Sequence, residues 1–412
     1  MSEADRVIII GAGQAGGQAS VSLRQMGYEG EIVLVGDEPA PPYQRPPLSK
    51  DYLKGKMERE RLFLKPEQFY ADQNITLKTS VTAEAIDTSA KTVRFSDGET
   101  LGYSRLIIAT GSRPRPLPIK GADLRNVMDL RTLQDIYELK PLVVEGKKAL
   151  IIGAGFIGLE AAAVMRGLGL DVTVIELSDR VLARVTFPVM SEFYETLHTR
   201  HGVKLVLSRS VNEITGLEAA TGVVLDNGDT LEADFVLVGI GILPNMEIAR
   251  DAGIACGNGI LVNEDAMTSE PDVYAIGDCA HRPLVHYGRE GRLESVHNAI
   301  EQGKIAAANI CGKPRPAEDV PWFWSDQYDT KLQIAGLSTD ADTVVTRGDP
   351  ASGHFAVFYF RDSALIAVDA VNSPPEFLTA KRLISTGASV SPEEVADTAV
   401  SMKDIMARAT AG

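Results

Sequence analysis

The chain contains the pattern Gly-x-Gly-x-x-Gly twice, and this repetition constrains its fold more than any other feature. Each copy follows a short apolar run and precedes a helical pattern: RVIIIGAGQAGGQAS begins at Arg6, and KALIIGAGFIGLEAA begins at Lys148. In such a strand–turn–helix unit the first glycine makes a tight turn, the second lets the backbone approach a pyrophosphate, and the third allows helix and strand to pack closely. The glycines are Gly11, Gly13 and Gly16 in the first copy and Gly153, Gly155 and Gly158 in the second.

The second copy indicates an NADH site. A further apolar strand is expected at 171–175, and it ends at Glu176, where an acid can hold an adenosine ribose through its 2′-hydroxyl. The same carboxylate would repel a 2′-phosphate, so NADH is favoured over NADPH. Arg180 and Arg184 follow closely and weaken this preference, because arginines near this point can accommodate the extra phosphate.

The first copy would then hold FAD. Its second strand is expected at 31–35, and Asp37 follows as the candidate ribose ligand. The segment TSEPDVYAIGDCA (268–280) supports this nucleotide. We expect it to be extended up to Gly277 and Asp278, which then open a helix. Asp278 would accept hydrogen bonds from the ribitol, and the helix would point at the pyrophosphate.

Two further segments indicate where the chain crosses between nucleotide domains. LIIATGSRPR (106–115) is a strand that ends in Ala109, Thr110 and Gly111, and DFVLVGIGILPN (234–245) is its counterpart on the way back. The predicted fold class is therefore α/β, with two Rossmann-like doubly wound domains and a C-terminal α+β domain. The predicted bounds are 1–113 with 245–320 for the FAD domain, 114–244 for the NADH domain and 321–412 for the C-terminal domain.

Composition excludes several other classes of protein. The 412 residues suggest two or three domains, and the net charge of −15 argues against nucleic acid or an anionic membrane as partner. The three cysteines share no C-x-x-C spacing, so neither a disulfide framework nor a cysteine metal cluster is expected. The six histidines contain no HExxH pair, and no metal is assigned. A reducing, cytoplasmic location is expected.

These motifs together resemble the FAD-dependent pyridine-nucleotide oxidoreductases with the glutathione-reductase fold. More narrowly, the chain is similar to the NADH-dependent ferredoxin reductases that serve bacterial cytochrome P450 and aromatic-ring dioxygenase systems. The resemblance covers nearly the whole chain. Besides both glycine motifs and the ATG segment, it depends on RPPLSK (45–50), YAIGD (274–278), RLESVHNAIEQ (292–302) and PWFWSDQYD (321–329).

The resemblance implies roles for particular residues. It places the proline-stiffened segment 45–50 along the flavin ring, with Lys50 near N5, and it pairs Lys50 with Glu160 near the nicotinamide. The backbone N–H of Val296, at the start of a helix, would face the flavin N1–C2=O edge. Arg131 and Trp324 would also contact FAD. The remaining candidate contacts are Ala15, Arg45 and Val81 for FAD, and Phe156, Ile157 and Gly241 for NADH.

The implied partner is a small [2Fe-2S] ferredoxin that docks transiently. Such ferredoxins are usually acidic, so a local basic patch is expected, with Lys65, Lys304 and Lys331 as candidates.

A rubredoxin reductase of the same fold is the main alternative. A thiol or peroxide enzyme would need a cysteine near the first glycine motif, yet the first cysteine is Cys256. A flavin-binding signalling protein would turn over slowly with NADH, and the C-terminal tail is expected to pack as a surface helix rather than bind membrane.

Overall fold

The computed structural model describes residues 5–411, which form two compact units, each built from several stretches of the chain. The chain passes between the units after Arg45, Met57, Arg113, Gly241 and Asp319. Of the described residues, unit 1 comprises 5–45, Glu58–Arg113 and Ile242–Asp319, and unit 2 comprises Pro46–Met57, Pro114–Gly241 and 320–411.

A parallel five-stranded sheet forms the centre of unit 1, in the order β20-β7-β1-β2-β3. The chain moves outward in one direction from β1 to β3 and then returns to the other side of β1, so a topological switch point lies beside β1, where α/β sheets bind ligands. The strands are β1 (Arg6–Ile10), β2 (Glu31–Val35), β3 (Ile75–Lys78), β7 (Arg105–Ile108) and β20 (Val273–Ala275).

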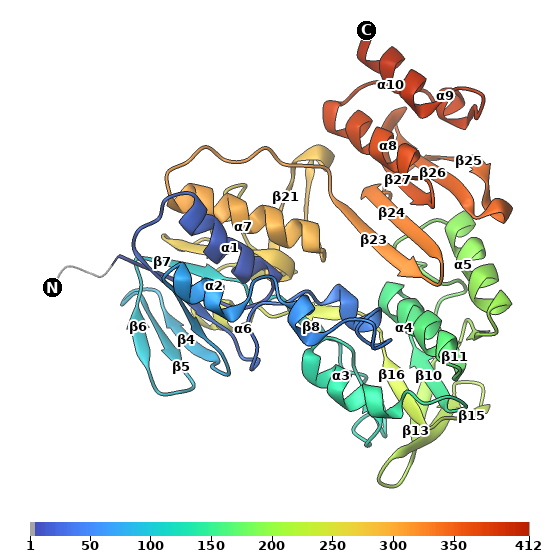
Figure 1. Cartoon of the computed structure of the whole chain (residues 1–412), viewed down its shortest axis with the longest axis horizontal. Coiled ribbons are helices and arrows are strands. Elements are labelled where there is room, and N and C mark those ends of the chain that lie inside the picture. The colour runs from blue at the N-terminus through green and yellow to red at the C-terminus, as the bar shows by residue number, and fades with distance from the viewer. Residues whose placement is uncertain (1–4, 412) are drawn as a thin grey trace. The chain divides into compact units, whose positions relative to one another are not determined.

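Helices α1 (Gln14–Gln25) and α7 (Val296–Ile310) lie side by side on one face of this sheet (Figure 1). Their small side chains, such as Ala19 and Ala306, pack with Ile9 and other sheet residues in one buried cluster. The opposite face packs against a small antiparallel sheet and α6. The other elements of unit 1 are α2 (Glu67–Asp72), β4 (Ala83–Asp87), β5 (Thr92–Phe95), β6 (Thr100–Gly102), β8 (Ser112–Pro114), β17 (Ile242–Pro244), α6 (Glu247–Asp251), β18 (Cys256–Gly257), β19 (Gly259–Leu261), β21 (Ala280–Leu284) and β22 (Arg289–Gly291).

One predicted helix of unit 1 is wrong. The sequence favours a helix opening at Gly277 and Asp278, but the structure has only a single 3₁₀ turn, Gly277–Cys279, followed directly by strand β21. Strand β21 pairs with β19 and β22, and Pro283 within it removes a donor that a helix would need. The helix that lies beside this turn is α7, and its predicted start at Val296 is confirmed.

Unit 2 repeats the same architecture. Its parallel sheet has the order β12-β11-β10-β16-β9, and the predicted strand at 171–175 is confirmed as β11. A three-stranded antiparallel sheet packs on one face. The elements of this part are β9 (Val127–Met128), α3 (Leu133–Leu139), β10 (Lys148–Ile152), α4 (Phe156–Gly167), β11 (Asp171–Ile175), α5 (Pro188–Arg200), β12 (Lys204–Val206), β13 (Val211–Gly216), β14 (Ala220–Leu225), β15 (Thr230–Glu232) and β16 (Phe235–Val238).

The C-terminal part of unit 2 is α+β. An antiparallel sheet in the order β23-β24-β27-β26-β25 packs against α8 and the tail, which forms two short helices rather than one (Figure 1). Val395 and Ile405 are buried in this packing. The elements are β23 (Trp322–Gln327), β24 (Thr330–Gly336), β25 (Thr343–Asp349), β26 (His354–Arg361), β27 (Ala364–Val371), α8 (Pro374–Thr386), α9 (Pro392–Ala396) and α10 (Met402–Ala411).

The fold class is therefore α/β with two doubly wound sheets and a C-terminal α+β region, as the sequence predicts. Within residues 5–411, no helix has the length and apolar character needed to span a bilayer.

Candidate functional site: two nucleotide cradles and a buried ion pair

The first glycine motif forms an open cradle at the carboxyl end of β1. Gly11 adopts a φ of +110°, and a Cβ there would lie 2.2 Å from the carbonyl oxygen of Ala109. A Cβ on Gly16 would lie 1.9 Å from the oxygen of Gly11, so glycine is required for the chain to close this turn. At Gly13 a Cβ would meet no atom within 4 Å. The space in front of Gly13 is therefore free for a ligand.

This space fits a pyrophosphate. Gly13 is the N-cap residue of the twelve-residue helix α1, and no side chain accepts a hydrogen bond from the helix's first N–H groups. Such a helix end presents unpaired donors and a positive partial charge, which suit a phosphate. The residues of unit 1 therefore fit the diphosphate of a dinucleotide.

The structure brings several other predicted FAD residues to the same edge of the sheet. A Cβ on Gly277 would lie 2.9 Å from the Cβ of Ala15, so the turn that begins at Gly277 lies against the start of α1. The Ser112 hydroxyl donates to Asp278 Oδ2 at 2.7 Å. The Thr110 hydroxyl donates to the backbone oxygen of Asn245 at 2.5 Å. These contacts fix Thr110 and Asp278 at adjoining strand ends.

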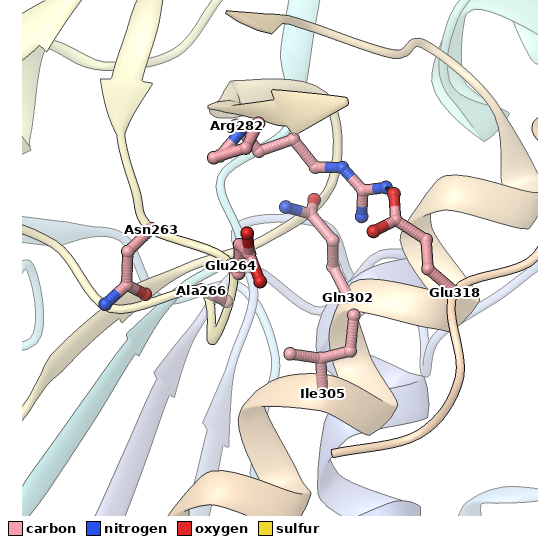
Figure 2. A pocket seen from close by; sticks show the side chains of 8 residues that line it. Asn263, Glu264, Ala266, Arg282, Gln302, Ile305 and Glu318 are labelled. Atoms are coloured by element: carbon pink, nitrogen blue, oxygen red, sulfur yellow. Dashed lines mark hydrogen bonds and ion pairs between the residues drawn. The ribbon is translucent and has the colours of Figure 1, made fainter. Parts of the chain in front are cut away.

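Gln302 on α7 supports the Gly277 turn from within. Its Oε1 accepts the Gly277 N–H at 2.7 Å, and its side chain lines a cavity of about 10 Å³, room for one water molecule. Figure 2 shows Gln302 beneath the guanidinium of Arg282, which forms an ion pair with Glu318. This cavity is too small for a nucleotide, and it is the hydrogen bond from the Gly277 N–H to Gln302 that supports the cradle.

The acidic residues after β2 differ in their surroundings. Asp37, the predicted ribose ligand, is exposed. The next residue, Glu38, accepts hydrogen bonds from Tyr43 Oη at 2.6 Å and from Arg45 Nη2 at 2.7 Å. Arg45 is thus held by Glu38 at the start of the proline-rich segment, and Val81 donates its N–H to Gly36 at 3.0 Å beside them.

The second glycine motif forms an equivalent cradle in unit 2. A Cβ on Gly158 would lie 2.2 Å from the oxygen of Gly153, whereas a Cβ on Gly155 would meet nothing within 4 Å. Gly155 is the N-cap residue of α4, again without a side-chain cap. Phe156 and Ile157 begin this helix, and Ile157 is exposed. The second cradle fits a dinucleotide for the same physical reasons as the first.

Glu176 is held at the edge of this second cradle. Its Oε2 accepts the Ala154 N–H at 2.7 Å and its Oε1 accepts the Ser178 N–H at 2.8 Å. Arg180 uses three of its five N–H donors within this region, because its guanidinium donates to the oxygens of Thr186 and Ala183 and to Ser191 Oγ at 2.8–2.9 Å.

Arg184 is exposed instead. A Cβ on Gly241 would lie 3.2 Å from its guanidinium. Of the two arginines in this loop, Arg184 is therefore the one whose guanidinium is accessible beside the predicted NADH contact at Gly241.

Unit 2 also contains the predicted ion pair of Lys50 and Glu160. Lys50 Nζ lies 2.9 Å from Glu160 Oε1, and both side chains are largely buried. Two hydroxyls complete the surroundings of the carboxylate: Ser49 donates to Oε2 and Ser325 donates to Oε1, each at 2.7 Å. The Lys50 ammonium lies 5.9 Å from the ring centre of Trp324, within cation–π range.

Segments from three parts of the sequence meet at this pair. The short 3₁₀ helix Pro46–Ser49, whose prolines restrict φ, delivers Lys50, and the second turn of α4 delivers Glu160. Strand β23 delivers Ser325 and Trp324. The sequence predicted Lys50, Glu160 and Trp324 but not the two serines.

The structure gives the positions of the other predicted site residues, and their contacts with nucleotides or a protein partner stay predictions. Val296 begins α7, and Ser295 Oγ accepts the Asn298 N–H at 3.1 Å, so the capping hydrogen bond does not use the Val296 N–H. Lys50, Arg131 and Trp324 belong to unit 2, whereas the other FAD candidates belong to unit 1, so their contact with FAD stays a prediction. The docking candidates are exposed, Lys65 and Lys304 in unit 1 and Lys331 in unit 2.

The cysteines lack the features of a reactive thiol. Cys256, Cys279 and Cys311 are all unpaired. Burial raises the pKa of the Cys279 thiol, which donates to the backbone oxygen of Ile276 at 3.3 Å. A raised thiol pKa disfavours the nucleophilic thiolate.

Comparison with known proteins extends these findings. The family described as pyridine nucleotide-disulphide oxidoreductase matches residues 5–303, and the family described as reductase C-terminal matches residues 322–406. The chain is 45% identical to rhodocoxin reductase of Rhodococcus erythropolis over 403 residues, 98% of this chain and 94% of that protein. It is 38% identical to a rubredoxin–NAD(+) reductase of Pseudomonas putida over 369 residues, 89% of this chain and 96% of that protein. The reductase in the crystal structure of the covalent putidaredoxin reductase–putidaredoxin complex is 42% identical, with a TM-score of 0.97 over 99% of both chains.

Proposed function

The chain belongs to the pyridine nucleotide-disulphide oxidoreductase family, and we propose that within it the protein is an NADH-dependent FAD reductase of a small [2Fe-2S] ferredoxin. The observation that carries this proposal is the pair of nucleotide cradles in one chain, each with an uncapped helix end and open space at the second glycine. The ferredoxin in turn would supply a cytochrome P450 or a ring-hydroxylating dioxygenase.

FAD is assigned to unit 1 and NADH to unit 2. In unit 1 the backbone at Gly11–Gly16 would hold the diphosphate, and Asp278, fixed by Ser112, would accept hydrogen bonds from the ribitol. When bound, FAD supplies the conversion between a two-electron donor and a one-electron acceptor. The protein's residues contribute position and electrostatics.

The preference for NADH is supported by the surroundings of Glu176. Two backbone N–H groups hold its carboxylate at the cradle, where it can accept from a ribose 2′-hydroxyl and oppose a 2′-phosphate. Three hydrogen bonds hold the Arg180 guanidinium against Ala183, Thr186 and Ser191, so it is less available than Arg184 to offset this charge. Of Arg180 and Arg184, it is therefore Arg184 that weakens the preference for NADH over NADPH.

Lys50 and Glu160 are the proposed catalytic pair. The buried charge of Lys50 is matched by the carboxylate of Glu160, which gives the ammonium a defined position. The family resemblance places this ammonium near flavin N5. Its role would be to respond to charge at that atom and to keep water away with Trp324. The assignment of Lys50 and Trp324 to FAD is part of the proposal.

The partner class follows from the relatives. Rhodocoxin reductase and putidaredoxin reductase are named for their acceptors, and the latter has been solved in covalent complex with putidaredoxin. Rubredoxin is the alternative acceptor, because a rubredoxin–NAD(+) reductase aligns with 89% of this chain. The exposed lysines Lys65, Lys304 and Lys331 are the proposed docking residues.

Two finer assignments complete the proposal. The domain bounds given above, with the C-terminal α+β part as a separate domain, stay our prediction. A cytoplasmic location is proposed as well, and the unpaired thiols of Cys256, Cys279 and Cys311 agree with a reducing compartment.

The proposal is tested by an absorbance scan of the purified protein and by stopped-flow mixing with NADH or NADPH. A yellow protein whose flavin band bleaches much faster with NADH is expected. Purified putidaredoxin and a purified rubredoxin then serve as acceptors, and faster steady-state reduction of putidaredoxin supports the ferredoxin assignment. Faster reduction of rubredoxin would favour the alternative. A colourless protein that cannot be reconstituted with FAD would refute both.

A further inference from the structure

Glu160 lies at the inner end of a chain of buried polar side chains. The carboxylate is 5% exposed and accepts from Lys50, Ser49 and Ser325. Because an ionised carboxylate only accepts hydrogen bonds, the Ser325 hydroxyl must use its single proton on Glu160. The Ser325 oxygen is thereby left to act as an acceptor on its other side.

The next three residues continue this arrangement. Gln327 Nε2 donates to Ser325 Oγ at 3.1 Å, which turns Gln327 Oε1 toward His198 Nε2 at 2.7 Å. That imidazole nitrogen must therefore carry the proton, and the other nitrogen, Nδ1, accepts from Tyr328 Oη at 3.3 Å. Every donor in the series Tyr328, His198, Gln327 and Ser325 points toward the carboxylate of Glu160.

The surroundings of His198 agree with this direction. Its side chain is fully buried on α5, and burial lowers the pKa of the imidazole to about 4, so the ring is neutral near pH 7. A neutral ring has one donor and one acceptor nitrogen, as the chain requires. His201 stacks on the Tyr328 ring with centroids 3.7 Å apart and so fixes the outer end.

The strand that carries Ser325 and Gln327 is unusual for its polarity. Alternate residues of a strand share a face, and in β23 the two fully buried positions are Ser325 and Gln327, while Asp326 between them is exposed. Buried polar groups destabilise a fold unless they are paired, and here each is paired with the next. Hydrogen bonds aligned in series also polarise one another, so the effect at the carboxylate exceeds that of Ser325 alone.

We propose that Ser325, Gln327, His198 and Tyr328 are positioning residues, a polar relay that holds the Glu160 carboxylate in the orientation that pairs with Lys50. The inference depends on the proposed function, since Lys50 is the residue that flavin reduction is expected to use. None of the four relay residues is assigned a contact with either nucleotide. They act through Glu160, and their influence should decline with distance along the relay.

The variants that test the relay differ in where they interrupt it. Ser325→Ala removes the last donor, and Ser325→Thr restores a hydroxyl. Gln327→Met interrupts the relay one bond further out with a side chain of similar length. Tyr328→Phe removes only the outermost donor and keeps the ring that stacks on His201. Asp326→Asn, at an exposed position of the same strand, is the matched control.

The first readout separates binding from turnover in the reductive half-reaction. Ser325→Ala should lower the limiting rate of flavin reduction by about tenfold, the equivalent of one hydrogen bond to a charged group, with the Kd for NADH within about twofold of wild type. Gln327→Met should have a smaller effect and Tyr328→Phe the smallest, while Ser325→Thr recovers most of the rate. Wild-type limiting rates in Ser325→Ala and Gln327→Met, with only the thermal midpoint lowered, would refute a positioning role.

The second readout does not depend on activity. Nitrogen-15 NMR of the histidine side chains should show His198 as a neutral ring with the proton on Nε2 near pH 7, in wild type and in Asp326→Asn. Gln327→Met should shift this signal or lose it to solvent exchange. A charged ring, or a proton on Nδ1, would contradict the direction of the relay. If wild-type flavin were not reduced by NADH, the proposed function would fail, and the NMR result alone would decide whether the relay exists.

Discussion

The ammonium of Lys50 lies 2.9 Å from Oε1 of Glu160, and the two side chains neutralise each other in a largely buried setting. Removing one partner of a buried pair leaves the other charge without compensation, which costs about 3–5 kcal/mol. Lys50→Met should therefore lower the urea midpoint markedly, and the double variant Lys50→Met with Glu160→Gln should recover part of the loss.

The same substitution should slow flavin reduction by NADH by at least about tenfold without releasing FAD, because electrostatic positioning groups contribute on this scale. Stopped-flow spectroscopy measures the rate, and the flavin-to-protein absorbance ratio measures retention. Lys54→Met is the control, since Lys54 is only half-buried and its ion pair is with the exposed carboxylate of Asp51. An unchanged reduction rate in Lys50→Met would remove Lys50 from the catalytic pair.

Alanine substitutions at Gly13 and Gly155 should each weaken the binding of a different nucleotide. A methyl group at either position enters open space, so Gly13→Ala and Gly155→Ala should still fold. Gly13→Ala should weaken FAD binding by about tenfold or more, because the methyl lies where the pyrophosphate approaches the backbone. Gly155→Ala should remain yellow and lose affinity for NADH.

Substitution of Gly16, the third glycine of the first motif, should prevent folding, in contrast to substitution of Gly13 or Gly155. A Cβ on Gly16 would lie 1.9 Å from the Gly11 oxygen, so Gly16→Ala should fail to accumulate as folded protein. Circular dichroism and flavin absorbance distinguish these cases. Loss of FAD from Gly155→Ala with retention in Gly13→Ala would reverse the assignment of the cradles.

Much of this arrangement is encoded locally and could be predicted. Strands 31–35 and 171–175 have the bounds expected from their apolar runs, because a buried parallel strand is a continuous apolar segment between polar residues. The cradles follow from the glycine spacing together with the apolar run before each motif and the helical pattern after it. The helix expected at Gly277 was wrong, because β21 is fixed by pairing with β19 and β22, which the local sequence does not contain.

The partners of Glu160 required the tertiary structure. Lys50 could be named from family resemblance, but Ser325, Gln327 and His198 lie on β23 and α5, far from Glu160 in sequence. The sequence did contain one indication of this network. Ser325 and Gln327 are two residues apart in a strand that also carries two tryptophans, and residues at this spacing point to the same face. The spacing of Ser325 and Gln327 in the sequence does not reveal that the buried acid they face is Glu160.

Glu176→Ala should reduce discrimination between the two reduced nicotinamide dinucleotides. The carboxylate is held by the N–H groups of Ala154 and Ser178, and its loss removes both a ribose acceptor and the charge that opposes a 2′-phosphate. NADH affinity should fall by about tenfold, and the NADH-to-NADPH ratio of kcat/KM should fall further. Glu176→Gln isolates the charge, and exposed Asp179→Ala is the control. A ratio that is unchanged in both Glu176 variants would show that another residue selects the nucleotide.

Asp369 should make the stability of the C-terminal sheet depend on pH. Its carboxyl group is 1% exposed on β27, and Tyr359 Oη donates to its Oδ2 at 2.7 Å. Burial raises the pKa of Asp369 from 3.8 to about 7. Between these values the folded protein holds a proton that the unfolded chain has lost. The stabilising contribution is therefore complete below about pH 4 and is lost as the pH rises toward 7.

Asp369→Asn keeps an acceptor for Tyr359 and cannot ionise. Its thermal midpoint should therefore be similar to that of wild type near pH 4.5 and exceed it at pH 8. The gain is bounded at about 4 kcal/mol, because each unit of pKa difference corresponds to about 1.4 kcal/mol. Asp362→Asn, at an exposed position near the end of β26, should show no such trend. A difference between Asp369→Asn and wild type that is constant from pH 4.5 to 8 would mean that Asp369 keeps the same protonation state in the folded and unfolded chains.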